Sequence, residues 1–193
     1  MRNANIILSS VLGLAIIGLL ACSGGSSSPT PIPDPPKFAT GLGYTDPGST
    51  GYRLVKSAAS TSKKLILELK GPASEMGRGV SFGLTVDGTK ARFVKVDNSD
   101  TEYAQNETFI LDSTPQLFKA VPDGNNALRA SIAQKGPGRA QVLSGVLARV
   151  ALQLQDNVSL GNITFSAVDA RVLRGDSGAS TPITIDYGTL VAQ

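Results

Sequence analysis

The chain has 193 residues, with 18 Lys and Arg against 15 Asp and Glu, which gives a formal net charge of +3. This charge is small and is carried by dispersed basic residues, which argues against nucleic acid as a partner. The sequence has one cysteine and no histidine. This composition excludes a disulfide framework, cysteine or histidine zinc sites and hydrolases that use a histidine base.

The first 21 residues predict an export signal. Arg2 supplies a positive charge, and the apolar run over residues 6–20 is too short and wrongly flanked for a transmembrane helix. The run ends in LLAC, where Ala21 precedes the single cysteine, Cys22. These four residues resemble the lipobox of bacterial lipoproteins. The resemblance implies cleavage between Ala21 and Cys22 and attachment of acyl chains, palmitate among them, to Cys22. The alternative is an ordinary secretory signal or an uncleaved anchor with an incidental cysteine.

Residues 22–37 predict a spacer without secondary structure. The stretch SGGSSSPTPIPDPP after Cys22 is rich in Ser, Gly and Pro and cannot build a core. An acylated cysteine holds a protein on a bilayer almost permanently, because each buried methylene contributes about 0.8 kcal/mol. Ser23 stands where many inner-membrane lipoproteins carry Asp. The lipoprotein resemblance therefore implies an exported, lipid-anchored protein, on the outer membrane or cell surface if the organism has two membranes.

Residues 38–193 predict an all-β domain, because apolar residues alternate along segments that turn-forming residues separate. The first strand begins near either Tyr44 or Tyr52, since the residues around them are mostly turn formers. Asp87-Gly88 predicts a hairpin between residues 80–86 and 91–96, because Gly accepts positive φ. The inward positions expected from the alternation are Leu65, Leu67, Leu69, Val80, Phe82, Leu84, Val86, Leu128, Ala130, Ile132, Val146, Ala148, Val150, Leu152 and Leu154.

The last two segments complete the predicted sheets. Ile163 and Phe165 alternate, but Val168, Ala170 and Val172 continue in the opposite phase, which predicts a bulge near residues 166–168. Residues 183–191 predict a final strand. About nine strands without a helical stripe predict an antiparallel β-sandwich.

Several segments in order resemble the cohesin-like family. They are GRGVSFGLTVDGTKARFVKV, LRASIAQKGPG followed by SGVLARVALQLQ, LGNITFSAVDARVLRGDSG and GTLVA, which together run from about Leu65 to Val191. The resemblance implies a nine-stranded jelly-roll sandwich related to some carbohydrate-binding modules. It also implies a protein partner, because the best-known members bind dockerin modules of polysaccharide-degrading enzymes. The matched motifs are mostly core positions, so they do not map the residues that face a partner.

One polar stretch, DNSDTE over residues 97–102, holds the candidate ligand-binding residues. Asp97, Asp100 and Glu102 carry oxygens that can ligate calcium, but the EF-hand spacing of glycine and terminal glutamate is missing, which favours a solvated loop. The sequence therefore predicts no cofactor and no metal site, with calcium as the alternative that these oxygens leave open. Tyr103, which follows, joins Asp97 and Asp100 as a candidate contact for a ligand.

Sugar binding usually needs exposed aromatic rings. The chain has no Trp, and Phe82, Phe93 and Phe165 are expected in the core. Candidate surface rings are Tyr44, Tyr52, Tyr103 and Tyr187, of which Tyr103 is expected to be the most exposed. No catalytic constellation stands out. We therefore expect a binding domain that tethers a protein partner, with a polysaccharide-binding module as the alternative.

Overall fold

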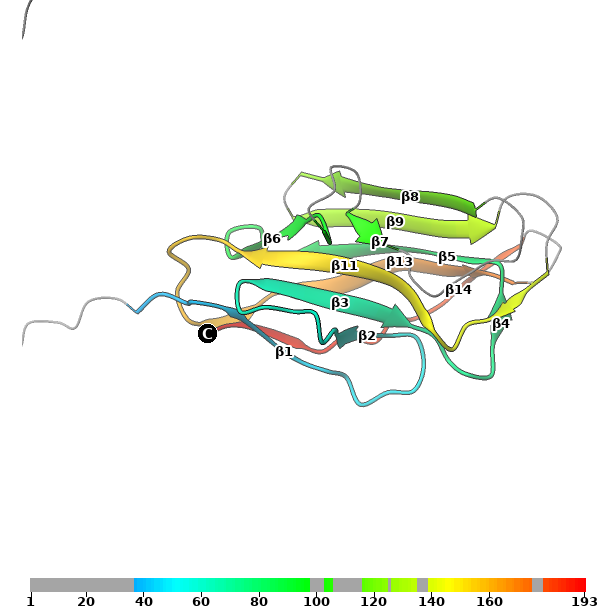
Figure 1. The fold of residues 1–193 in the computed structure, drawn as a ribbon, viewed down its shortest axis with the longest axis horizontal. Helices are drawn as coiled ribbons and strands as arrows, with labels where there is room; N and C mark the ends of the chain where they lie inside the picture. The colour runs from blue at the N-terminus through cyan, green and yellow to red at the C-terminus, as the bar shows by residue number, and fades with distance from the viewer. Residues whose placement is uncertain (1–36, 98–102, 106–115, 125, 135–138, 175–178) are drawn as a thin grey trace, which may run out of the picture. The chain divides into compact units, whose positions relative to one another are not determined.

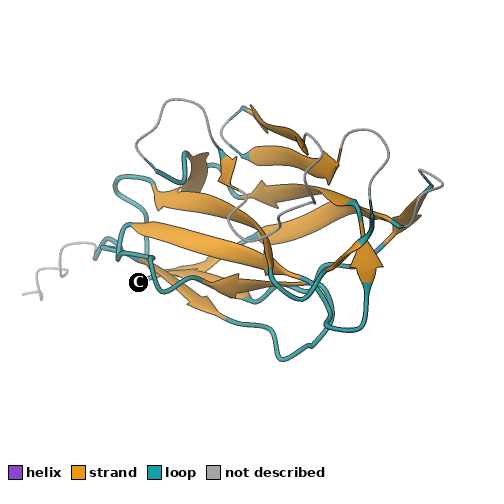
Figure 2. Cartoon of the chain, turned by 45° about the vertical axis from the view of Figure 1, so that its right-hand side comes forward, coloured by secondary structure: helices purple, strands orange, loops and turns teal. Residues whose placement is uncertain are grey.

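The computed structural model describes residues 37–97, 103–105, 116–124, 126–134, 139–174 and 179–193. The predicted signal and Cys22, nearly all of the spacer, and Asp100 lie outside the described residues. The described residues form strands and loops (Figure 2), and they belong to one unit spanning Pro35–Gln193. No described part of the chain forms a helix with the length and hydropathy that a membrane crossing needs.

Two large antiparallel sheets form the layers of the domain (Figure 1). The first, here the β3–β11 sheet, has the order β2 (Arg53–Lys56), β3 (Lys64–Lys70), β11 (Val146–Leu154), β6 (Ala91–Val94), and β7 (Ala104–Gln105) also pairs with β11. The second, here the β5–β9 sheet, has the order β14 (Ser180–Pro182), β13 (Phe165–Leu173), β5 (Gly79–Val86), β9 (Ala127–Gln134), β8 (Gln116–Asp123).

The described residues also form two smaller sheets. One has the order β1 (Leu42–Thr45), β15 (Thr189–Ala192), β12 (Gly161–Ile163), and the other pairs β4 (Met76–Gly77) with β10 (Gln141–Val142). Tyr44 lies within β1 and Tyr52 directly precedes β2, so each marks a separate strand. Of the predicted final strand, residues 189–191 belong to β15, which pairs with β1.

The core lies between the two large sheets and confirms the predicted alternation. Its fully buried side chains include Leu65 and Leu67 of β3, Leu84 of β5 and Leu128 and Ile132 of β9, all 0% exposed. The three phenylalanines expected in the core are buried there. Burying apolar side chains on the facing sides of two sheets is the main stabilising term of a sandwich. The predicted antiparallel β-sandwich is confirmed.

The alternation fails at the start of β11, where the pairing with β3 shifts register between Val146 and Ala148. Leu147 is fully buried in the core, whereas Val146 is only partly buried. A bulge adds one residue and reverses the side-chain phase, so Leu147 takes the position expected for Val146.

The bulge in β13 exists but lies further along than predicted. The pairing with β5 shifts register between Val168 and Arg171, and Asp169 within it has a φ of 49°. Of the three residues in the second phase, Ala170 and Val172 are buried, whereas Val168 is 39% exposed and precedes the shift. The left-handed region suits Asp better than a β-branched residue, which explains why the irregularity centres on Asp169.

The predicted hairpin at Asp87-Gly88 is wrong, because β5 and β6 belong to different large sheets. One carboxylate oxygen of Asp87 accepts hydrogen bonds from the Thr89 backbone N–H (3.0 Å) and hydroxyl (2.6 Å). The Ala91 N–H donates to the Asp87 carbonyl oxygen at 3.0 Å. This side-chain-capped turn carries the chain across the core instead of folding it back on the same sheet.

Candidate functional site

The outer face of the β5–β9 sheet is hollowed along its centre. Because Phe82, Ala130 and Ile132 point into the core, their neighbours Ser81, Gly83 and Ser131 lie on the outer face, where they form a floor of small residues. The hollow has a volume of about 430 Å³. A smaller one of about 160 Å³ shares Ser81 and Ser131 and continues toward the other end of the strands. We call the two together the trough.

The rim of the trough mixes apolar and charged side chains. Val121 from β8 is 45% exposed, and the β13 bulge places Asp169 opposite. Arg129 Nη1 lies 3.9 Å from the Asp169 Oδ2 atom, and both side chains are more than 70% exposed. An ion pair so exposed contributes little to stability, which leaves both groups available to a partner.

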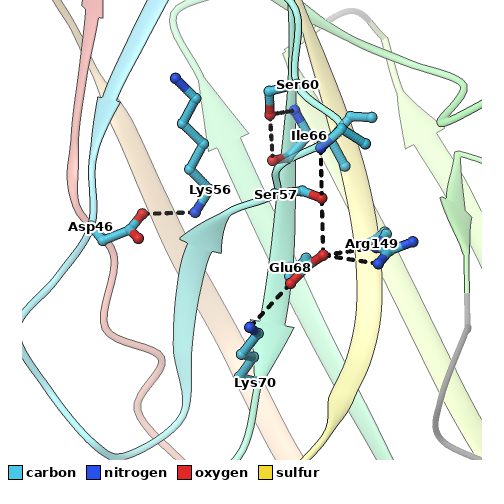
Figure 3. A network of polar contacts seen from close by, with 9 residues as sticks. Asp46, Lys56, Ser57, Ser60, Ile66, Glu68, Lys70 and Arg149 are labelled. Atoms are coloured by element: carbon cyan, nitrogen blue, oxygen red, sulfur yellow. Dashed lines mark hydrogen bonds and ion pairs between the residues drawn. The ribbon is translucent and has the colours of Figure 1, made fainter.

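The β3–β11 sheet carries a polar network on its outer face (Figure 3). Glu68 Oε1 accepts hydrogen bonds from Ser57 Oγ at 2.9 Å and from Arg149 Nε at 3.0 Å, and Glu68 Oε2 lies 3.2 Å from Lys70 Nζ. Burial opposes ionisation of Glu68, but these three partners outweigh it and hold the pKa of the carboxyl below its usual value. The network joins β3 to β11 and to the chain after β2, and we assign it a structural role.

The structure brings together two of the three predicted ligand-binding residues. Asp97 and Tyr103 line one hollow of about 480 Å³ on the outer face of the β3–β11 sheet. Gln105 Nε2 donates a hydrogen bond to the Asp97 carboxylate, and Lys95 Nζ lies 6.0 Å from the centre of the Tyr103 ring. Asp100 and the third candidate calcium ligand, Glu102, lie outside the described residues. Within the described ranges, no three Asp, Glu, Cys or His side chains gather as metal ligands would.

The tyrosines differ from the expected order of exposure. Tyr103 is only partly exposed and packs against the core, and Tyr44 does the same. Tyr52 is 5% exposed, whereas Tyr187 is 41% exposed and meets the Phe165 ring edge-on at 5.8 Å. The most exposed tyrosine of the described residues is therefore Tyr187 and not Tyr103.

Reasoning from the sequence missed the trough. The sequence does place small residues, Ser81, Gly83 and Ser131, at the outward positions of two alternating strands. These residues indicate a hollow only once β5 and β9 are known to be neighbours in one sheet. The place of Asp169 at the rim depends in addition on the bulge.

Comparisons with known proteins identify the fold. The sequence matches no family model and no curated protein. Among solved structures, it is similar to a type II cohesin domain from the cellulosome of Acetivibrio cellulolyticus, with a TM-score of 0.52 and 12% identity over 72% of this chain and 93% of that one. It is also similar to the type II cohesin dyad from the adaptor ScaA scaffoldin of that organism, with a TM-score of 0.54 and 12% identity over 75% and 49% of the two chains. The domain therefore has a cohesin-like fold.

Proposed function

We propose that the domain is a tethering module that captures a protein partner in the trough. The observation that carries this proposal is an open, hollowed sheet face on a cohesin-like fold. A floor of small residues lets a partner's side chains approach the sheet closely. The exposed Val121 supplies apolar contact, and Arg129 and Asp169 supply charges of both signs, as protein interfaces generally combine.

The second part of the proposal is the anchor. The LLAC sequence supports cleavage before Cys22 and its acylation. The spacer behind it then sets the reach of the domain, because a flexible chain of this length has a root-mean-square extent of about 20 Å and its prolines lengthen it. Tethering concentrates a captured partner near the membrane without any new contact.

Binding is favoured over catalysis by the composition of the whole chain. With no histidine, the usual general base is missing, and the described rim of the trough has one carboxylate, Asp169, paired with Arg129. A polysaccharide-binding module of the related fold is the alternative, and the experiment below separates the two.

The test is a pull-down with a variant that fills the trough. The full chain in mild detergent is immobilised and loaded with proteins secreted by the native organism. Ser131→Arg places a long side chain on the trough floor, and Ser144→Arg adds the same charge at an exposed position outside it. We expect the wild type and Ser144→Arg to capture the same polypeptide in similar amounts. Ser131→Arg should capture at least tenfold less of it.

Two outcomes decide between the hypotheses, and two more test whether the pairing needs calcium. Equal capture by Ser131→Arg refutes the trough as the docking surface. Retention on a polysaccharide matrix, released by soluble glycan and without a captured protein, establishes the alternative instead. Release of the polypeptide by a calcium chelator shows that the pairing needs calcium, and release only by denaturant shows that it does not.

A further inference from the structure

A row of basic and amide side chains crosses the outer face of the β3–β11 sheet. Gln153 of β11 is in register with Lys64 of β3 on one side and with Arg92 of β6 on the other. Neighbouring strands lie about 4.8 Å apart, so the two cationic residues are rooted about 10 Å from each other. All three line the 480 Å³ hollow that also holds Asp97 and Tyr103.

Among the described residues that line the hollow, the cations Lys64, Arg92 and Lys95 outnumber the one carboxylate, Asp97. Among the described residues, neither Lys64 nor Arg92 forms an ion pair, and Arg92 Nη2 donates to Gln153 Oε1 at 3.3 Å. The neighbouring carboxylate on this face, Glu68, already holds Lys70 and Arg149. Lys64 and Arg92 lie on either side of Gln153, so both long side chains can reach one anionic group bound above Gln153.

We propose that this hollow binds a saccharide unit that carries a carboxylate, as in an acidic polysaccharide. The Arg92 guanidinium presents the planar fork that pairs with a carboxylate, and Lys64 adds a second charge. Gln153 supplies an amide group that hydrogen-bonds hydroxyls, and the Asp97 carboxylate repels a dianion such as phosphate more strongly than a single carboxylate. The volume lies within the range of small-ligand sites.

This site is independent of the trough. The two hollows lie on the outer faces of different sheets, with the core between them, so both can be occupied at once. The inference therefore goes beyond the proposed capture of a protein. A module with both sites would hold its partner while it rests on an acidic glycan.

The experiment measures binding of a galacturonic acid trimer to the full chain by calorimetry in low salt. The matched ligand is the same trimer with its carboxylates reduced to alcohols, and the second probe is inorganic phosphate. The test variant is Lys64→Gln with Arg92→Gln. Its control, Lys119→Gln with Arg129→Gln, removes the same charge from the trough rim.

We expect the acidic trimer to bind the wild type and the trough variant within twofold of each other, and the hollow variant at least tenfold more weakly. Raising the salt concentration should weaken binding, because charges at the surface are screened. The proposal is overturned if the acidic trimer does not bind, or if the reduced trimer binds equally well. It is also overturned if phosphate competes at equal affinity, or if the trough variant loses as much binding as the hollow variant. Thermal melting of both variants checks that they are folded.

The two proposals fail separately. If the hollow binds the trimer and Ser131→Arg still captures a polypeptide, the trough assignment falls and the glycan site stands. If the hollow variant captures the partner normally but the wild type does not bind the trimer, the glycan site falls and the trough assignment stands.

Discussion

Replacing Glu68 by Gln tests whether the charge of this buried carboxylate stabilises the sandwich. The side chain of Glu68 is 10% exposed, and it receives hydrogen bonds or ion pairs from Ser57, Lys70 and Arg149 at 2.9–3.2 Å. Gln keeps one acceptor oxygen, but it removes the charge and turns an amide group toward a cation. Asp46→Asn is the matched control, because the one hydrogen bond that Asp46 accepts among the described residues is a peripheral one from the Lys56 N–H, at 2.7 Å (Figure 3).

The size of the effect follows from burial. Removing one partner of a fully buried ion pair costs about 3–5 kcal/mol. Here the Arg149 and Lys70 side chains are 22% and 34% exposed, so water partly solvates them once the carboxylate is lost. We therefore expect Glu68→Gln to lower the free energy of unfolding by about 2 kcal/mol at pH 7, and Asp46→Asn by less than about 0.5 kcal/mol.

The pH dependence gives the reasoning a sharper test. The pKa of Glu68 is lowered by folding from its usual 4.5, so the folded state binds fewer protons than the unfolded state. The stabilisation is complete above pH 4.5 and is lost as the pH falls through the lowered folded-state pKa. Urea unfolding at pH 7 and at pH 3 should show the difference between wild type and Glu68→Gln shrinking in acid. A difference that is equal at both pH values, or negligible at pH 7, would refute the assigned role of the charge.

Two further predictions concern the pairing of β1 with β15. Gly188→Ala should destabilise by about 3 kcal/mol in urea unfolding, because a Cβ there would lie 1.7 Å from the Thr45 carbonyl oxygen. Gly48→Ala, with no atom within 4 Å of its new Cβ, is the control, and equal stability of the two variants would contradict the clash. Tyr44→Phe should cost about 1–2 kcal/mol, because the hydroxyl donates to the Leu54 carbonyl oxygen (3.1 Å) and accepts from the Gly188 N–H (2.7 Å). Burial raises the pKa of Tyr44 from 10.0 to about 12, so the wild type should lose stability between these pH values, and a loss just as steep in Tyr44→Phe would assign it to another group.

The strands could be predicted largely because their signal is local. In β3, β5 and β9 the inward residues alternate with period two, and each such residue is buried where the pattern placed it. The errors fall where a strand departs from that period. At Leu147 and Asp169 a bulge reverses the phase, and its position depends on the facing strand.

The turn after β5 shows the same limit. Asp87-Gly88 is a good local turn signal, and a turn is what forms. Whether the following strand returns to the same sheet or crosses to the other depends on which sheet edge is free, and the turn residues carry no information on that. The local residues predict a hairpin, but the packing of the two layers places β6 in the other sheet.

The all-β class, the apolar faces of the main strands and the exclusion of histidine chemistry could be inferred without any coordinates, because each depends on composition or on neighbours along the chain. Asp97 and Tyr103 are close in the chain, and they line the same hollow. The folded chain was needed to see that Ser81 and Ser131 form one floor, and that Lys64 and Arg92 flank Gln153 in one row. Those residues are distant in the chain, and strand order and register, which arise from long-range pairing, bring them together.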